Sequence, residues 1–311
     1  MADGDIVLGA NQYGKAECRL VRITRDAGRA GRHEIEDLNV TSQLRGDFEA
    51  CHTDGDNSQV VATDTQKNTV YAFAGEYGVG SPEAFLLRLA RHFTGEFAWV
   101  SGGTWSAEQY AWQRIVAGGE PHDHAFARAG TETRTVVVQV DGAETFVISG
   151  LTDCTVLKST GSEFSGFPRD RYTTLPETDD RILATSVTAW WRHGAPPGGA
   201  DHVEDLDFDA SFEAVRAVML ETFATFHSRA LQQTLFAMGK AVLEAFPGIV
   251  ECRFSMPNKH HFLVDLTPFG QDNPGEVFFA ADRPYGLIEA AVVREGVPEE
   301  PRAWTGIPGF C

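Results

Sequence analysis

Two side chains in the stretch 155–181 are of types that bind flat, negatively charged rings. Phe164 offers an aromatic face, and Arg181 offers a planar fork of N–H donors. The residues between them include turn formers and charges, which are uncommon in a hydrophobic core. The other interpretation is a solvated loop with one anchoring phenylalanine and one surface arginine, and composition alone favours it.

A second candidate site lies at 257–262, between two strand-like runs. If this backbone is extended, Asn258 and His260 point to one face of the strand, and Lys259 and His261 point to the other. Two adjacent histidines on opposite faces do not readily share one metal ion. The pattern therefore favours either a pocket wall with one amide and one imidazole or a single structural histidine.

His122 and His124 flank Asp123, a spacing that would allow two imidazoles and a carboxylate to face one metal ion. The sequence offers no identifiable third and fourth ligand. A polar loop with several histidines is therefore the favoured interpretation.

Four further positions have side chains whose chemistry depends on their surroundings. Lys15 begins a strand-like run, Thr63 and Asp64 begin a helical pattern whose first turn they can cap, and Gln232 stands near the start of a later helix. Taken alone, they are a surface lysine, a helix cap and a polar helix residue. The primary amide of Gln232 could still pair with both a donor and an acceptor on a heterocycle.

The composition excludes several classes of function. The 311 residues carry a formal net charge of −18, which disfavours binding to nucleic acid or to anionic membranes. No apolar run reaches the roughly 18 residues that a membrane-spanning helix needs, and no secretory signal pattern is evident. The five cysteines are odd in number and include no Cys-x-x-Cys pair, so we expect reduced thiols. The last residues are not the Ser-Lys-Leu peroxisomal address, and we expect a cytoplasmic protein.

Hydrophobic periodicity predicts the same order of elements twice, with strands, then two helices, then strands. In the first half we expect strands at 15–24 and 32–44, helices at 63–74 and 81–92, and strands at 98–104 and 107–115. In the second half we expect strands at 134–140, 144–150, 155–158 and 182–192, helices at 209–226 and 230–246, and strands at 249–256 and 261–266. The stretch 117–130 between the halves reads as irregular. The sequence therefore predicts an α+β fold with two similar halves, 1–130 and 131–311.

These segments together resemble the urate oxidase (uricase) family. The most specific match is 155–181, where Lys158-Ser159-Thr160, Phe164 and the final Arg181 recur at the family's spacing. The resemblance covers nearly the whole chain. Its further blocks are 11–15, 37–47, 61–71, 232–234, 257–265 and 282–288.

The resemblance implies two tandem tunnelling-fold (T-fold) units per chain, each an antiparallel sheet with a pair of helices. It also implies a homotetramer in which sheets of several subunits close into a β-barrel tunnel. The activity implied is oxidation of urate by O2 and water to 5-hydroxyisourate and hydrogen peroxide, without metal or organic cofactor. The absence of nucleotide-binding and zinc-finger motifs agrees with this expectation.

The resemblance also implies roles for particular residues. A proton relay would use Lys15, Thr63 and His260. Urate and O2 would be held by the remaining site residues, through side chains at Phe164, Arg181, Gln232 and Asn258 and through the main chain at Asp64 and Leu231. The family arrangement takes Lys15, Thr63 and Asp64 from one subunit and the others from its neighbour, so that each active site lies at a subunit interface.

Two other functions stay open on the sequence. A zinc-dependent pterin or purine enzyme on the same fold needs a cluster of Cys and His ligands, and no such cluster is evident. A non-catalytic purine-binding oligomer would keep the pocket without turnover, and loss of Lys15 or His260 would have been its sign.

Overall fold

The computed structural model describes residues 6–195 and 206–307, and the chain forms two compact units. The first unit contains the chain as far as Ser149, a segment ending at Asp209, and Glu299–Gly306. The second unit contains Gly150–Gly194 and Ala210–Pro298. Among the described residues, no helix has both the length and the apolar character needed to cross a membrane.

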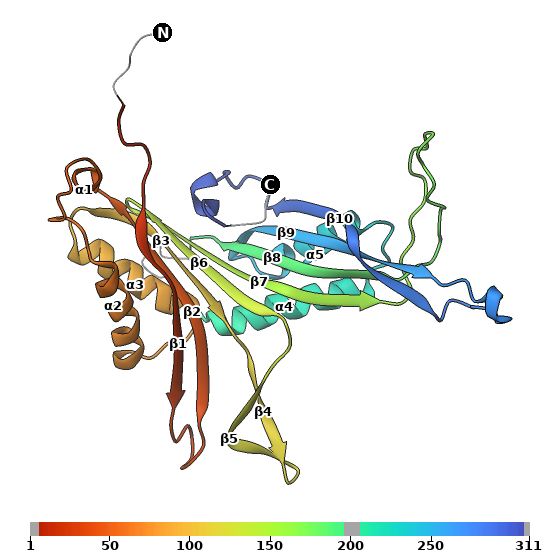
Figure 1. Ribbon diagram of the computed structural model, residues 1–311, viewed down its shortest axis with the longest axis horizontal. Coiled ribbons are helices and arrows are strands. Elements are labelled where there is room, and N and C mark those ends of the chain that lie inside the picture. Colours follow the sequence, from red (N-terminus) through yellow and green to blue (C-terminus); the bar gives the residue numbers. More distant parts are fainter. Residues whose placement is uncertain (1–5, 196–205, 308–311) are drawn as a thin grey trace. The chain divides into compact units, whose positions relative to one another are not determined.

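The first unit is an antiparallel sheet with two helices packed against one face (Figure 1). Its neighbouring strands, in order across the sheet, are β1 (Tyr13–Thr24), β2 (Glu34–Gly46), β3 (Val100–Gln109) and β6 (Thr133–Asp141). The helices are the short α1 (Glu49–Thr53), then α2 (Thr63–Glu76) and α3 (Pro82–Glu96), and the segment at 299–306 adds a 3₁₀ turn, η3 (Pro301–Trp304).

Alternation along the strands explains which face the helices cover. Leu38, Val40 and Leu44 on β2 are fully buried, and they share a core with Trp105 of β3. Phe93 of α3 stacks on Trp105, with 6.5 Å between ring centres. The apolar side of each element therefore meets in one core, as the period-2 pattern predicts.

The start of α3 was predicted correctly in its chemistry. The Ser81 hydroxyl accepts a hydrogen bond from the Ala84 N–H at 3.3 Å, and Pro82 occupies the first turn. The predicted cap of α2 is wrong, because Ala62 holds the capping position and Thr63 is the first helical residue. The Thr63 and Asp64 side chains therefore do not cap the N-terminus of that helix.

A buried ion pair ties α3 to the sheet of the first unit. Glu83, in the first turn of α3, lies 2.7 Å from the Arg134 guanidinium of β6 and accepts a hydrogen bond from Ser149 at 2.6 Å. The Glu83 carboxyl is inaccessible to solvent, so its charge depends on these two partners.

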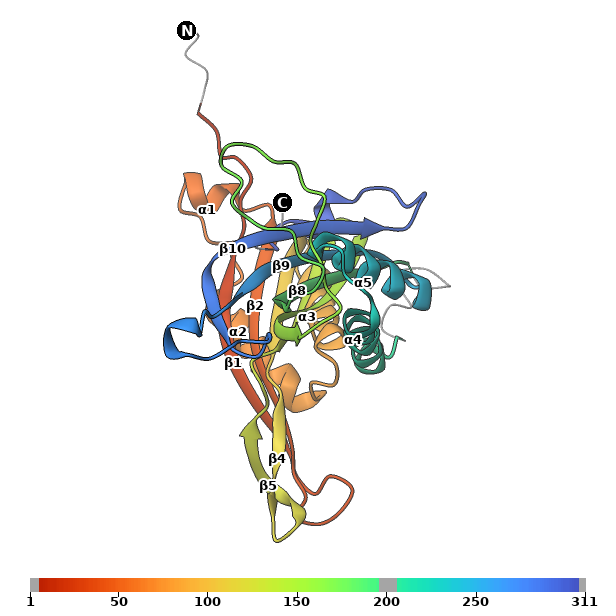
Figure 2. The ribbon, with the colours of Figure 1, turned by 90° about the vertical axis from the view of Figure 1, so that its right-hand side faces the viewer.

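The second unit has the same plan of strands and paired helices (Figures 1 and 2). Its strands are the latter part of β7 (Glu144–Lys158), then β8 (Leu183–His193), β9 (Ile249–Leu263) and β10 (Phe278–Val293), which are neighbours in that order. The helices are α4 (Phe208–Thr225) and α5 (Leu231–Ala245), and η2 (Thr267–Phe269) is a 3₁₀ turn between β9 and β10. Residues of α4 and α5 build the second core with apolar residues of β7, β8 and β9.

Three of the expected strand breaks are wrong. β3 continues through 105–106, because Trp105 and Ala107 keep the alternation of buried positions. β7 continues through 151–154 with a positive φ of 58° at Asp153, which is a local irregularity within one strand. β9 continues through Pro257, which lies opposite Leu287 of β10.

The stretch 117–130, expected to be irregular, contains most of a β-hairpin. Strands β4 (Trp112–Ala117) and β5 (Glu120–Arg128) pair with each other and extend away from the main sheet of the first unit (Figure 1). Gly118 and Gly119 form the turn with φ values of 64° and 88°, which glycine adopts without strain.

The α+β content agrees with the prediction. The compact units divide inside β7, whereas the predicted repeat boundary lies at residue 130, before β6. The difference is mainly β6, whose residues pair with β3 along its whole length. The division into two similar halves at 1–130 and 131–311 stays a prediction.

Candidate active site

A cavity of about 490 Å³ in the second unit brings together four of the predicted site residues. Phe164 and Arg181 reach it from the long loop between β7 and β8, and Asn258 and His260 reach it from β9. The two candidate regions of the sequence, which are about 80 residues apart, therefore line one pocket.

Backbone hydrogen bonds fix the ends of the long loop. The Phe164 N–H donates to the Thr178 carbonyl at 2.8 Å, and the Thr178 N–H donates back at 3.1 Å. The Arg181 N–H donates to the Ser162 carbonyl at 2.8 Å. The Arg181 guanidinium carbon consequently lies 5.1 Å from the centre of the Phe164 ring, within cation–π range.

A second aromatic ring supports Phe164. The Phe167 ring stacks on it with 5.0 Å between centres and 14° between planes, and Arg169 lies over Phe167 at 5.3 Å. Phe167 was not among the candidate site residues predicted from the sequence. The spacing of two phenylalanines three residues apart, around Gly166 with its positive φ, was the available signal.

Arg181 is a half-buried cation whose donors are incompletely used. Burial lowers the pKa of its guanidinium below the ordinary value. Its Nε is buried and has no hydrogen-bond acceptor within the part of the chain that the structure describes. A buried donor without a partner is costly, so an anion in the pocket would gain a strong contact here.

The β9 residues follow the predicted alternation in part. Asn258 lies opposite Thr185 of β8 and Gly286 of β10, and His260 lies opposite Ala281. Both side chains line the pocket. His261 is also among the lining residues, near the end of the strand, whereas Lys259 is not.

The surroundings of His260 favour its neutral form. Burial is the main cause of its lowered pKa, and the positive charge of Arg181 and the neighbouring His261 add to it. A neutral imidazole can accept a proton at one nitrogen and donate one at the other, which suits a group that passes protons.

Leu231 and Gln232 form the first turn of α5 and are not among the described residues that line the cavity. Leu231 is buried in the second core, so only its main chain is available to a ligand. Gln232 is exposed. A bridge between Ser162 and Ser228, with the Glu163 N–H donating to the Ser228 carbonyl at 2.8 Å, ties the approach to α5 to the loop that carries Phe164.

Lys15, Thr63 and Asp64 belong to the first unit. Lys15 lies opposite Ser42 just before an irregularity in β1, and its charge adds to the lowering of the Asp64 pKa. The main cause of that lowering is the hydrogen bond from Lys67, which is also an ion pair. The structure therefore places the Lys15 charge near the start of α2, where Thr63 stands.

The His122–His124 segment belongs to the β4–β5 hairpin. Asp123 forms ion pairs with Arg29 and Arg32, and the two imidazoles lie edge to face with 4.5 Å between ring centres. Across the residues described, no group of three or more His, Cys, Asp or Glu side chains is placed to hold a metal ion.

Comparison with known proteins identifies the family. The uricase family model matches residues 11–139 and again 147–289. The chain belongs to the uricase family. It is 60% identical to uricase from Arthrobacter globiformis over 98% of this chain and 96% of that one, and 38% identical to uricase from Aspergillus flavus over 93% and 97%.

The fold agrees with solved uricases. The crystal structure of the Arthrobacter globiformis uricase superimposes with a TM-score of 0.88 at 60% identity, covering 96% of this chain and 98% of that one. A uricase from Bacillus fastidious, 26% identical, superimposes with a TM-score of 0.75 and covers 94% of each chain. The predicted family and the predicted fold class, with its two tandem T-fold units, are thus confirmed.

Proposed function

We infer that this member of the uricase family is a urate oxidase, an oxidoreductase that converts urate, O2 and water to 5-hydroxyisourate and hydrogen peroxide. The observation that carries this inference is the pocket in which Phe164, Arg181, Asn258 and His260 meet. Its aromatic face and half-buried guanidinium suit a flat anion, and its amide and neutral imidazole suit proton handling.

We propose that three side chains bind the urate ring. Phe164 stacks on its face, Arg181 donates to its anionic edge, and the Gln232 amide pairs with the opposite edge. The main chain at Leu231 and Asp64 supplies further hydrogen bonds. The buried Leu231 side chain supports a main-chain role for that residue, because it is occupied in the second core.

Lys15, Thr63 and His260 form the proposed proton relay. Lys15 removes a proton from the urate anion through the Thr63 hydroxyl, and His260 holds or returns the proton. The Thr63 hydroxyl is not used as the N-terminal cap of α2. Asn258 holds O2 or water above the ring. The deprotonated ring is electron-rich enough to reduce O2 without a bound cofactor, so the protein's work is binding and proton transfer.

We further propose a homotetramer whose active sites lie at subunit interfaces. The described residues that line the cavity include no lysine, and the proposed base Lys15 belongs to the first unit. Lys15, Thr63 and Asp64 would come from the first unit of a neighbouring chain. We also propose a cytoplasmic location and no nucleic-acid or membrane partner, in keeping with the net charge of −18.

The test is loss of urate absorbance, with peroxide measured in parallel, using protein treated with a chelator. Equal consumption of urate and formation of peroxide is expected, and Lys15→Met should abolish most of it. Lys240→Met is the matched control, because Lys240 is an exposed lysine paired with Glu244 on α5. Loss of activity after treatment with the chelator would contradict the proposal that the reaction needs no metal.

Calorimetry separates the remaining outcome. If urate binds but is not consumed, the pocket assignment stands and the chain is a purine binder without turnover. If urate neither binds nor reacts, the assignment of the pocket is wrong.

A further inference from the structure

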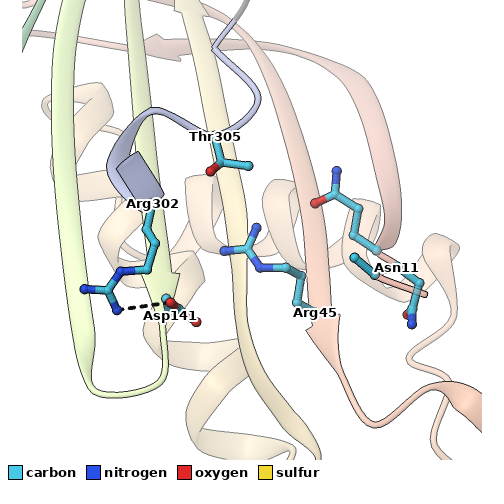
Figure 3. A pocket seen from close by; sticks show the side chains of 7 residues that line it. Asn11, Arg45, Asp141, Arg302 and Thr305 are labelled. Atoms are coloured by element: carbon cyan, nitrogen blue, oxygen red, sulfur yellow. Dashed lines mark hydrogen bonds and ion pairs between the residues drawn. The ribbon is translucent and has the colours of Figure 1, made fainter. Parts of the chain in front are cut away.

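A second cavity, of about 390 Å³, lies in the first unit and contains none of the proposed active-site residues. Asn11 and Gln12 line it just ahead of β1, Arg45 lines it from the end of β2, Asp141 from the end of β6, and Arg302 from η3. In Figure 3 the Arg45 side chain reaches from its strand into the middle of this cavity. Asn11 lies on one side of it, and Arg302 with Asp141 lies on the other.

Arg45 is a half-buried cation whose hydrogen bonds all go to neutral groups. Its Nη1 donates to the Thr104 hydroxyl at 3.0 Å, and its Nη2 lies within 3.0–3.3 Å of three oxygens. These three are the carbonyls of Gly103 and Val140 and the side-chain oxygen of Gln139. One N–H of Nη1 and the Nε N–H therefore have no acceptor within residues 6–195 and 206–307, and no carboxylate in that part of the chain forms an ion pair with Arg45.

Asn11 contributes the complementary group. Its Nδ2 donates to the Gly9 carbonyl at 3.3 Å. The Asn11 Oδ1 is buried and has no donor among the described residues. A buried acceptor without a partner costs stability, so a ligand N–H at this position would be favourable.

The other two charges in the cavity largely neutralise each other. Arg302 forms an ion pair with Asp141 at 3.2 Å, and it also pairs with Glu144 and Glu300 outside the cavity lining. Arg302 thus forms ion pairs with three carboxylates. Arg45 forms no ion pair within the described residues, although the charge of Asp141 acts on its guanidinium.

We propose that this cavity binds a small monocarboxylate that also carries an amide N–H, the chemistry of an N-acylamino acid. Its carboxylate accepts from an unused N–H of Arg45, and its amide N–H donates to the Asn11 Oδ1. The volume lies within the range of small-molecule sites.

The test is isothermal titration calorimetry of the full-length protein with two probes that differ in one group. N-acetylglycine carries the N–H, and N-acetylsarcosine has a methyl group in its place. We expect N-acetylglycine to bind at least about tenfold more tightly than N-acetylsarcosine, because the methyl group leaves the Asn11 oxygen unpaired. Equal binding of the two probes, or binding of neither, would overturn the proposal.

Variants assign the binding to this cavity. Arg45→Gln should weaken N-acetylglycine binding at least about tenfold. Arg25→Gln, which removes an exposed arginine, and Arg181→Ala, which removes the guanidinium of the other cavity, should leave it unchanged. If Arg45→Gln fails to fold, the proposal is still tested by comparing the two probes on the unsubstituted chain and by N-acetylglycine binding to Arg181→Ala. Loss of binding in Arg181→Ala would place the ligand in the active site and refute the proposal.

Discussion

Replacing Arg134 by methionine should destabilise the first unit by about 3–5 kcal/mol, because it leaves the Glu83 carboxylate buried without its cation. Glu83 is 0% exposed and Arg134 is 9% exposed, so water cannot take the place of the lost partner. At a urea dependence of about 3 kcal/mol/M, the unfolding midpoint should fall by roughly 1–2 M. Urea unfolding followed by tryptophan fluorescence at fixed protein concentration measures this shift.

The pH dependence gives the sharper test. Burial raises the pKa of Glu83, and the Arg134 charge opposes that rise. A carboxyl whose pKa is higher in the folded state stabilises the fold fully below its unfolded pKa, and this contribution is lost as the pH rises through the folded pKa. Without Arg134 the folded pKa rises further, so the variant should lose most stability at neutral pH and least at acidic pH.

The double variant Glu83→Gln with Arg134→Met should recover much of the loss, because no charge is then buried. Arg25→Met, at an exposed position, is the control and should change stability by less than about 0.5 kcal/mol. A loss below about 1 kcal/mol for Arg134→Met, or an equal loss at acidic and neutral pH, would refute the reasoning.

Three further predictions concern the proposed active site. Lys15→Met should lower kcat far more than it changes KM in steady-state assays, since its proposed role is proton transfer; a change in KM alone would mean the role is misassigned. Arg181→Ala should raise the urate Kd by about 10–100-fold in calorimetry, because a charge-assisted hydrogen bond contributes about 1.5–3 kcal/mol, and unaltered affinity would exclude Arg181 from urate binding. Arg181→Gln should raise the pKa of His260 in an NMR titration, since a neighbouring positive charge is removed, and the acid-side fall in kcat should move to higher pH. An unchanged His260 titration would show that the two groups do not interact.

The sequence predicted the parts of the fold in which local patterning and tertiary packing agree. The helices after Ser81 and Ala230 have apolar residues at helical spacing that the cores use, so their bounds were nearly correct. The long strands were predicted as fragments, because Pro257 and the positive φ at Asp153 interrupt the pattern without ending the pairing. Strand β10 was not predicted, since Pro284 and an irregular register obscure its alternation.

The site was predictable to a different degree. Residue types and strand alternation identified Phe164, Arg181, Asn258 and His260, but only the folded loop shows that they share a pocket. The stacking of Phe167 on Phe164 could not be predicted, because it depends on the turn between them. Likewise, the hydrogen bonds of Arg45 to neutral groups follow from long-range packing that periodicity does not report.

The backbone pairing at the base of the loop between β7 and β8 also makes this loop suitable for insertion of a tag or label. Because Phe164 and Thr178 pair through their backbones, the two ends of the chain segment between them are held together by hydrogen bonds. Its tip is an exposed turn around Tyr172, which contacts its sequence neighbours Asp170 and Arg171. Lengthening a flexible loop to twice its size costs only about 0.6 kcal/mol in closure entropy. A peptide tag or fluorescent label inserted beside Tyr172 should therefore leave the pocket in place.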